Sequence, residues 1–216
     1  VGAYGQEVRE TIVSVKTIDR HTLETVEFTN ADCLFGYRQS RFKSIDAEKY
    51  IVVGATFRLT KHGRPEVRYP ELQKFIASSV DGGASLDGEP ALRIVREAVL
   101  GLRRRKSMVL DPNDPNSRSV GSFFMNPVIS MEQFNELQAR WNQSGGLGQI
   151  PAFPSGGRVK VPAAWLVEQS GFPKGYRSGG GGVAQNHSLA LVNYGGTTRE
   201  LLDLAVRIHD EVSRRF

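Results

Sequence analysis

The sequence predicts an α+β protein, and two kinds of periodicity predict it. Residues 8–28 and 50–59 carry apolar and polar side chains in near alternation, which is typical of strands with one buried face. Residues 89–105, 131–142 and 197–212 instead repeat apolar side chains three or four positions apart, which is typical of helices. The first third is therefore expected to be mostly sheet, and the second half is expected to mix helices with strands.

A β-hairpin is predicted at the start of the chain. Alternation from residue 8 to residue 15 is followed by a polar turn at 19–21 and a second apolar run at 23–28. A loop follows, in which aromatic and charged side chains interleave in the sequence FGYRQSRFK at 35–43. The run at 50–59 returns to sheet.

Residues 89–105 form the first predicted helix. Pro90 suits a first helical turn, and the cationic residues at 103–106 gather at the end of the helix, where its dipole favours them. The face of this helix is expected at Leu92, Val95, Val99 and Leu102. The following sequence, DPNDPN at 111–116, is typical of turns. We therefore expect one domain at residues 1–110 and another at 111–216.

Capping residues organise the second half. Ser130 and Gln133 have the form of a capping box and predict a helix to about residue 142, and Thr197 with Glu200 has the same form at the last helix. A glycine-containing loop is expected at 144–157, a short helix within 161–170 closed by Gly171, and a buried strand at 189–193. The inner face of the last helix is predicted to hold Leu201, Leu204, Ala205, Ile208 and Val212.

Composition narrows the class of protein. The 216 residues are 39% hydrophobic, and no stretch reaches the roughly 18 apolar residues of a membrane span. Without a signal-peptide pattern, a soluble cytoplasmic protein is expected. Cys33 is the sole cysteine, so we expect no internal disulfide and a buried thiol. The four histidines show no metal-ligand spacing, and no metal is assigned; they are His21, His62, His187 and His209.

Taken singly, the candidate motifs each have two interpretations. The net charge of +5 and the basic run at 103–106 suit nucleic-acid binding or an ordinary solvated helix end. The glycines at 179–182 suit a phosphate-binding loop or a flexible turn, and the turn is favoured because the spacing of known phosphate loops is absent. Ser122 could be a strand-edge residue, Arg38 a surface side chain packed along Tyr37, and Trp165 a core residue.

The order of the motifs is more specific than any one of them. The segments are, in sequence, GAYGQEV, FGYRQSRFK, RYPEL, RRRKSMVLDPNDPNSRSVGSFFMNP, AAWLVEQSGFPKGYRSGGGGVAQNHSLALVN and a terminal helix. In this order they resemble the UDP-N-acetylenolpyruvoylglucosamine reductases of bacterial cell-wall synthesis, over nearly the whole chain. The RYPEL loop is similar to the longer form of this family. The implied architecture is the C-terminal part of a two-subdomain FAD-binding domain, followed by an α+β substrate-binding domain.

The resemblance implies an FAD- and NADPH-dependent oxidoreductase that reduces an enolpyruvyl group to give UDP-N-acetylmuramate. Hydride would add to the terminal methylene carbon, and the carboxylate-bearing carbon would need a proton. The Ser of the GSFF motif, here Ser122, is the implied general acid, walled by aromatic rings. The Arg of the GYRxS motif, here Arg38, is the implied clamp for the substrate carboxylate.

Further residues match family positions that bind ligands. The implied substrate-binding residues are Tyr69, Lys106, Asn126, Lys174 and His187, and those that border the flavin are Gly2, Tyr4 and Glu7. The family residue that matches His187 is often Gln, so the sequence departs from the pattern there.

Both ends of the sequence look cut. A second catalytic residue of the family, a Glu after the last helix, is expected to lie beyond residue 216, and the glycine-rich flavin-phosphate loop before residue 1. The expected partners are a UDP-sugar and NADPH, with neither nucleic acid nor membrane, and a monomer is expected. The alternative function is a UDP-sugar-binding module without catalysis.

Overall fold

The computed structural model describes residues 2–61, 63–79 and 87–216, so His62 lies outside the described residues. The chain divides into two compact units, Val1–Leu100 and Gly101–Phe216, and each is described by itself. Both contain helices and sheets, in agreement with the predicted α+β class. The functional division after residue 110 stays a prediction.

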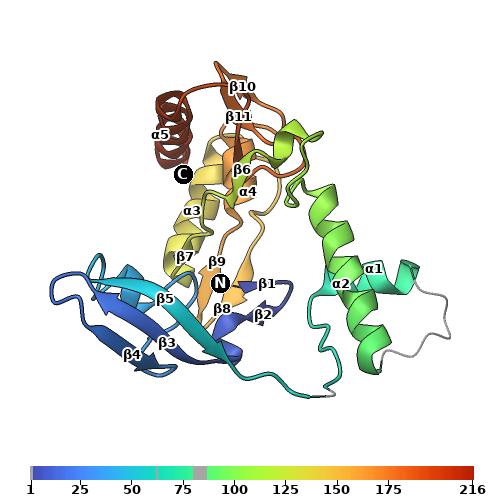
Figure 1. Ribbon diagram of the computed structural model, residues 1–216. Coiled ribbons are helices and arrows are strands. Elements are labelled where there is room, and N and C mark those ends of the chain that lie inside the picture. Colours follow the sequence, from blue (N-terminus) through green and yellow to red (C-terminus); the bar gives the residue numbers. More distant parts are fainter. Residues whose placement is uncertain (1, 62, 80–86) are drawn as a thin grey trace. The chain divides into compact units, whose positions relative to one another are not determined.

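The first unit contains a three-stranded antiparallel sheet in the order β4-β3-β5 (Figure 1). Its strands are β3 (Ile12–Asp19), β4 (Thr25–Thr29) and β5 (Tyr50–Phe57). The predicted hairpin is thus present, but its first strand does not begin at Val8. Residues Val8–Glu10 form a 3-10 helix, η1, because consecutive polar residues at 9 and 10 break the alternation that a ladder requires.

The turn of this hairpin is held by Asp19. Its carboxylate accepts hydrogen bonds from the backbone N–H groups of His21 at 2.8 Å and Thr22 at 3.2 Å. These two bonds lower the pKa of the Asp19 carboxyl below its usual value. Leu23 has φ 61° and lies in the connection, which shortens the predicted second strand at its start.

The core of the first unit lies under the sheet and includes the sole cysteine. Val15, Phe28 and Cys33 are buried, and Phe28 makes edge-to-face contacts with Phe42 and Tyr50. Cys33 is fully buried, as predicted, and burial raises the pKa of its thiol. A second 3-10 helix, η2 (Arg41–Lys43), follows the FGYR loop.

A helix that was not predicted begins within the RYPEL sequence, at Pro70. Helix α1 (Pro70–Ser79) has Pro at its first position, Glu71 in the first turn, and buried Leu72 and Ile76 at helical spacing. The RYPEL sequence was interpreted as a loop, although the proline, the acidic residue and the apolar spacing that indicate a helix are all close together in the sequence.

Helix α2 (Gly88–Arg105) is present where predicted, with Arg103, Arg104 and Arg105 in its last turn. Of the predicted face, Leu102 is buried and Val95 and Val99 are partly buried, whereas Leu92 is 51% exposed. The buried residues are Ala91, Ala98 and Leu102. Ala91 and Ala98 thus lie on the buried side of α2, although such small side chains add little to an apolar sequence pattern.

The second unit contains two antiparallel sheets, in the orders β10-β11-β12-β6 and β7-β9-β8. The strands of the first are β10 (Arg177–Ser178), β11 (Gly181–Val183), β12 (Ala190–Asn193) and β6 (Ser119–Ser122). Those of the second are β7 (Val128–Ile129), β9 (Arg158–Lys160) and β8 (Phe153–Ser155). The predicted loop at 144–157 therefore contains a strand, which at three residues is too short to show a period.

Helices cover these sheets (Figure 1). They are α3 (Met131–Gln143), α4 (Ala163–Gln169) and α5 (Thr198–Arg215). Both predicted capping boxes form with both of their hydrogen bonds, at Ser130 with Gln133 and at Thr197 with Glu200. Helix α5 packs on β11 and β12 through Leu204, Ala205 and Ile208, as its sequence predicted. Trp165 packs partly buried against Trp141, also as predicted.

The glycine segment at 179–182 contains the predicted turn at Gly179 and Gly180, between β10 and β11. Gly181 and Gly182 are buried in β11. A Cβ on Gly180 would lie 2.1 Å from the Cα of Gly196, so a side chain at position 180 cannot fit beside that backbone. Close packing, which depends on the rest of the fold, accounts for these glycines.

Candidate functional site

Ser122 lies at the end of β6, where it forms a hydrogen bond with a histidine. Its Oγ is 2.9 Å from Nε2 of His187, which belongs to the loop between β11 and β12. The two residues are 65 positions apart in sequence. Antiparallel pairing of β6 with β12 brings them together, with Ala190 opposite Ser122. The backbone N–H of Phe123 also donates to the carbonyl of Leu189 at 2.7 Å.

The residues around Ser122 explain the unusual GSFF sequence. Gly121 has φ 80°, a conformation that favours glycine, so the strand can change direction at the residue before the serine. Phe124 packs against the core and contacts Phe123 edge to face, with ring centroids 5.3 Å apart. The paired rings therefore anchor the strand end. The Ser122 hydroxyl itself is exposed, whereas a hydroxyl walled by rings was expected.

Two lysines lie near His187, and both had been predicted as ligand-binding residues. Burial and the positive charges of Lys106 and Lys174 lower the pKa of the imidazole below 6.5. The neutral form is therefore favoured at neutral pH. Ser122, Lys106, Lys174 and His187, all predicted from sequence, come together in the second unit.

A polar network supports the loop that carries His187. Asn186 donates to Oγ of Ser107 at 2.9 Å, and Ser107 in turn bonds the Asp114 carboxylate, which has a lowered pKa. Asn116 accepts from the backbone of Gln185 at 3.0 Å and from the Tyr194 hydroxyl at 2.7 Å.

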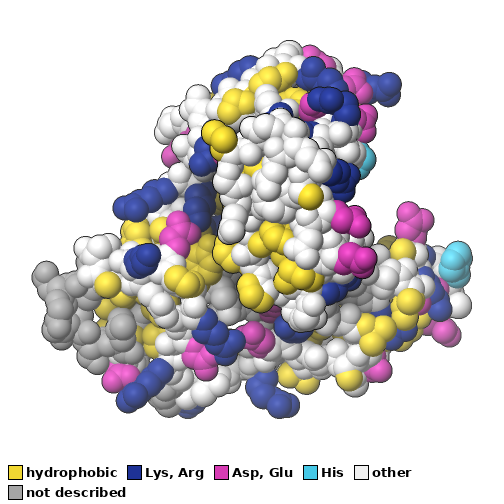
Figure 2. All heavy atoms as spheres, turned by 180° about the vertical axis from the view of Figure 1, so that it is seen from behind, with side chains coloured by type: hydrophobic (Ala, Val, Ile, Leu, Met, Phe, Trp, Pro, Cys, Tyr) yellow, Lys and Arg dark blue, Asp and Glu magenta, His cyan; other side chains and the backbone are white. Residues whose placement is uncertain are grey.

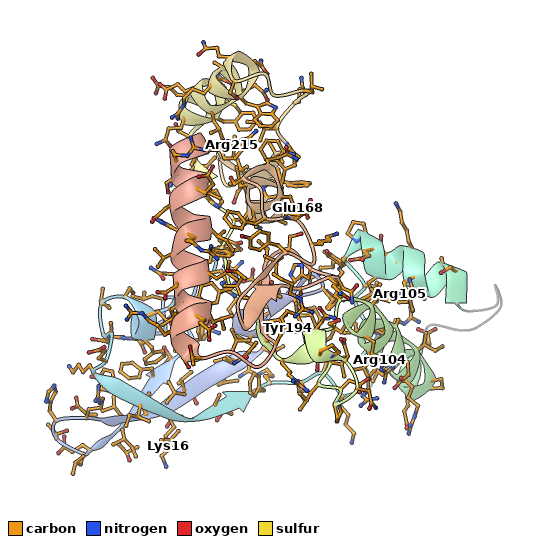
Figure 3. The ribbon with its side chains drawn as sticks, turned by 90° about the horizontal axis from the view of Figure 1, so that it is seen from above. Lys16, Arg104, Arg105, Glu168, Tyr194 and Arg215 are labelled. Carbon is orange, nitrogen blue, oxygen red and sulfur yellow. The ribbon has the colours of Figure 1, made fainter. Side chains whose placement is uncertain are left out.

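Other charged side chains border this network. The Arg177 guanidinium lies over the Tyr194 ring, and Ser188 donates from its Oγ to the Glu168 carboxylate. Figure 3 shows Glu168 on α4 and Tyr194 after β12. The network was not predicted. The DPNDPN sequence was interpreted only as a turn, but its Asp and Asn side chains are also of the type that forms hydrogen bonds with neighbouring segments.

Asn126 has a structural contact in addition to its predicted role. Its Oδ1 accepts a hydrogen bond of 2.8 Å from the backbone N–H of Ala163, at the start of α4. Pro162 supplies no side-chain cap there, so Asn126 caps the helix from another segment. Among the described residues its amide N–H groups form no hydrogen bond, so they are available to an acceptor on a ligand.

Arg38, the predicted carboxylate clamp, lies in the first unit on an exposed turn. It has φ 57°, a left-handed conformation, and its carbonyl accepts a hydrogen bond of 3.0 Å from Nζ of Lys43. Within the described residues of this unit its guanidinium forms neither a hydrogen bond nor an ion pair. The guanidinium is therefore available to a ligand.

Three residues predicted to border the flavin lie on or beside one small hairpin of the first unit. Strands β1 (Gly2–Ala3) and β2 (Gln6–Glu7) pair through a turn at Tyr4 and Gly5. The Tyr4 ring contacts the ring of Tyr69 edge to face, with centroids 5.5 Å apart. The structure thus joins a predicted flavin neighbour to a predicted substrate-binding residue.

Surface charge, hydropathy and the placement of metal-binding residue types add three observations. On the face shown in Figure 2, Lys and Arg side chains are interspersed with Asp and Glu. In residues 2–61, 63–79 and 87–216, no helix is both long and apolar enough to cross a membrane. The same described residues contain no group of three or more His, Cys, Asp or Glu placed to hold a metal ion.

The family model described as the C-terminal domain of UDP-N-acetylenolpyruvoylglucosamine reductase matches residues 112–216. The reductase of that name from Thermobifida fusca is 46% identical over 221 residues, which cover 100% of this chain and 60% of the relative. The one from Mycobacterium tuberculosis is 42% identical over 223 residues, covering 100% of this chain and 58% of the relative. The chain therefore spans about three fifths of the length of these curated relatives.

The fold agrees with this likeness. The crystal structure of UDP-N-acetylenolpyruvylglucosamine reductase from Thermus caldophilus superposes with a TM-score of 0.54 at 19% identity, and covers 98% of this chain and 53% of that chain. At that identity the structure supports the fold alone. Residues 112–216 thus match the C-terminal domain of the UDP-N-acetylenolpyruvoylglucosamine reductase family, and the whole chain is similar in sequence to reductases of that name.

Proposed function

We propose that this chain supplies the substrate lobe and part of the flavin site of an NADPH-dependent reductase. The substrate would be the enolpyruvyl ether of UDP-N-acetylglucosamine, and the product UDP-N-acetylmuramate, for cell-wall peptidoglycan. The observation that carries the proposal is the Ser122–His187 hydrogen bond beside Lys106 and Lys174, in a chain 46% identical to a reductase of that name.

Ser122 is the proposed general acid. Reduction adds hydride to the terminal methylene carbon of the substrate and leaves an electron pair on the carboxylate-bearing carbon. A hydroxyl fixed by β6 and by its hydrogen bond to His187 can donate its proton there. A serine is a weak acid in water, so its position and its hydrogen-bond partner have to supply the catalytic advantage.

Arg38 is proposed to bind the substrate carboxylate. A guanidinium presents two parallel N–H groups to the two carboxylate oxygens, which both orients the substrate and stabilises charge that spreads onto those oxygens. Lys106, Lys174 and Asn126 are proposed to bind the UDP diphosphate, with the lysines as point charges. Tyr69 would hold the same end of the substrate from the first unit.

FAD, when bound, supplies the two-electron chemistry that links NADPH to the substrate. The hairpin at residues 2–7 fits one edge of a flavin, because Gly2 and Ala3 are exposed and lack large side chains. Gly2, Tyr4 and Glu7 are the proposed flavin neighbours. We also propose that residues 1–110 are the C-terminal part of a two-subdomain FAD-binding domain and residues 111–216 the substrate domain.

The proposed setting follows from the substrate. UDP-sugar precursors of the cell wall are made in the cytoplasm, so we propose a cytoplasmic monomer whose partners are the UDP-sugar and NADPH. Neither nucleic acid nor membrane is a proposed partner. The interspersed acidic and basic side chains in Figure 2 favour this over a nucleic-acid surface.

Purification of the full-length protein tests the proposal. A yellow protein whose flavin is bleached by NADPH and recoloured by the enolpyruvyl substrate is expected. A colourless protein that binds UDP-sugars would favour the alternative, a non-catalytic sugar-nucleotide module. A protein that binds neither ligand would contradict both.

A further inference from the structure

His187 was assigned to substrate binding, but its contact is with the proposed acid. Nε2 of His187 lies 2.9 Å from Ser122 Oγ. When Ser122 gives up its proton, the alkoxide that forms requires either a hydrogen-bond donor or a replacement proton. A neutral imidazole can offer the first, and only an imidazolium can offer both.

The groups that face His187 determine which form is present. Lys106 approaches from the end of α2 and Lys174 from the turn before β10, and their charges disfavour the imidazolium. The Asp114 carboxylate is bonded to Ser107, which accepts from Asn186, and the Glu168 carboxylate is bonded to Ser188. In the free protein burial lowers the pKa of His187 most, and the two lysines lower it further.

A bound diphosphate changes this balance. Its two negative charges, placed on Lys106 and Lys174 as the proposed function requires, would cancel the positive field at His187. The imidazole would then gain a proton more readily. By thermodynamic linkage, the diphosphate would also bind more tightly to the protonated protein.

We propose that binding of the UDP-sugar charges His187, and that the imidazolium is the source of the proton that Ser122 passes to the substrate. In this step the Ser122 O–H bond breaks as a C–H bond forms at the carboxylate-bearing carbon. The Nε2–H bond breaks as a new Oγ–H bond forms. The two electrons come with the hydride from the reduced flavin, and the neutral imidazole takes a proton from water afterwards.

His187 thus acts through Ser122: it resupplies the proton of the Ser122 hydroxyl and does not itself touch the reacting carbon. The inference rests on the proposed function, since it requires a UDP-sugar at Lys106 and Lys174. A glutamine can hold the Ser122 hydroxyl by a hydrogen bond, but it cannot store a proton.

Proton uptake tests the inference without turnover. Binding of UDP-N-acetylglucosamine to the flavin-loaded full-length protein is measured by calorimetry, in buffers with different ionisation enthalpies, from pH 5.5 to about pH 8. This ligand is a diphosphate diester and does not itself titrate near pH 6.5. The expected result is net proton uptake around pH 6.5, which disappears in His187→Gln.

A matched control is His209→Gln. His209 is an exposed histidine of α5 that bonds Asp210 and does not touch the Ser122 site. This variant should take up protons as the parent does. His187→Asn serves as a second variant should His187→Gln fail to bind flavin. Equal uptake in parent and His187→Gln, or none in the parent despite binding, would overturn the inference. A failure to bind the UDP-sugar at all would contradict the proposed function instead.

A kinetic measurement separates proton supply from positioning. In His187→Gln, reoxidation of the reduced flavin by the enolpyruvyl substrate should slow by about 10- to 100-fold, with its dependence on pH flattened, while reduction by NADPH is unchanged. An unchanged pH profile in this variant would mean that His187 only holds the hydroxyl in place, which would also overturn the inference.

Discussion

The two units hold their candidate residues in different ways. In the second unit, Ser122 lies at the end of β6 and His187 in the loop before its partner strand β12, and a network of side chains supports that loop. In the first unit, Arg38 and Tyr69 lie on exposed connections, and Arg38 projects an open guanidinium. Proton transfer depends on a fixed distance between the donor and the carbon that accepts the proton. A substrate carboxylate, in contrast, can orient the guanidinium that binds it. The difference suits the proposed roles: the acid Ser122 is held in place before the substrate binds, and Arg38 is ordered by the carboxylate that it binds.

The largest effect that would sharpen this contrast is expected from Ser122→Ala. Loss of the acid should slow reoxidation of the flavin by substrate by about 10²- to 10⁴-fold, because the carbanion loses its proton donor. Reduction by NADPH should hardly change. Stopped-flow spectroscopy separates the two half-reactions. Ser119→Ala, on the same strand, is the control and should behave as the parent. Equal losses in both half-reactions would remove Ser122 from its role.

A smaller effect is expected from Arg38→Lys. A point charge cannot reproduce two parallel hydrogen bonds, so kcat/KM for the enolpyruvyl substrate should fall by about 10- to 100-fold, or roughly 1.5 to 3 kcal/mol. Binding of UDP-N-acetylglucosamine, which has no carboxylate, should not change. Arg20→Lys, on the exposed hairpin turn, is the matched control. Normal turnover in Arg38→Lys would show that the first unit contributes no clamp.

The Tyr4–Tyr69 contact is expected to have a smaller effect still. An edge-to-face pair contributes about 0.5 to 1.5 kcal/mol, so a double-mutant cycle with Tyr4→Leu and Tyr69→Leu should give a coupling of that size in substrate affinity. Titration calorimetry at each corner of the cycle measures it. Additive effects would mean that the flavin edge and the substrate loop act independently.

The pH dependence of affinity should have the smallest amplitude. The pKa of His187 is lowered in the free protein and is proposed to rise in the complex, so the complex binds more protons between these two values. Affinity for UDP-N-acetylglucosamine should therefore increase as pH falls through this window, by less than about tenfold per pH unit. An affinity that is independent of pH in the parent would contradict this linkage.

Local signals allowed much of the fold to be predicted. The capping boxes at Ser130 and Thr197, the inner face of α5 and the buried strand β12 depend on neighbours in sequence, and all are present. The buried positions of α2 and the places of Gly181 and Gly182 in β11 depend on what packs against them, so periodicity alone put Leu92 on the buried face and did not predict the strand glycines. Helix α1 was missed although its signals were local.

For the candidate site too, some features could be predicted from the sequence, whereas others depend on contacts between distant residues. Resemblance to the family supplied Ser122, Lys106, Lys174 and His187 one by one. Their assembly around a hydrogen bond between residues 65 positions apart follows from strand pairing, which no local pattern reveals. The second contact of Asn126, with the start of α4, was likewise hidden because it joins residues far apart in sequence.

A crystal structure of the flavin-loaded full-length protein with UDP-N-acetylmuramate bound would test the central claim most directly. The account predicts that Ser122 Oγ lies about 3 to 3.5 Å from the carboxylate-bearing carbon. It also predicts that the Arg38 guanidinium holds the carboxylate and that the diphosphate contacts Lys106 and Lys174. A carboxylate bound elsewhere, with Ser122 directed away from that carbon, would contradict it.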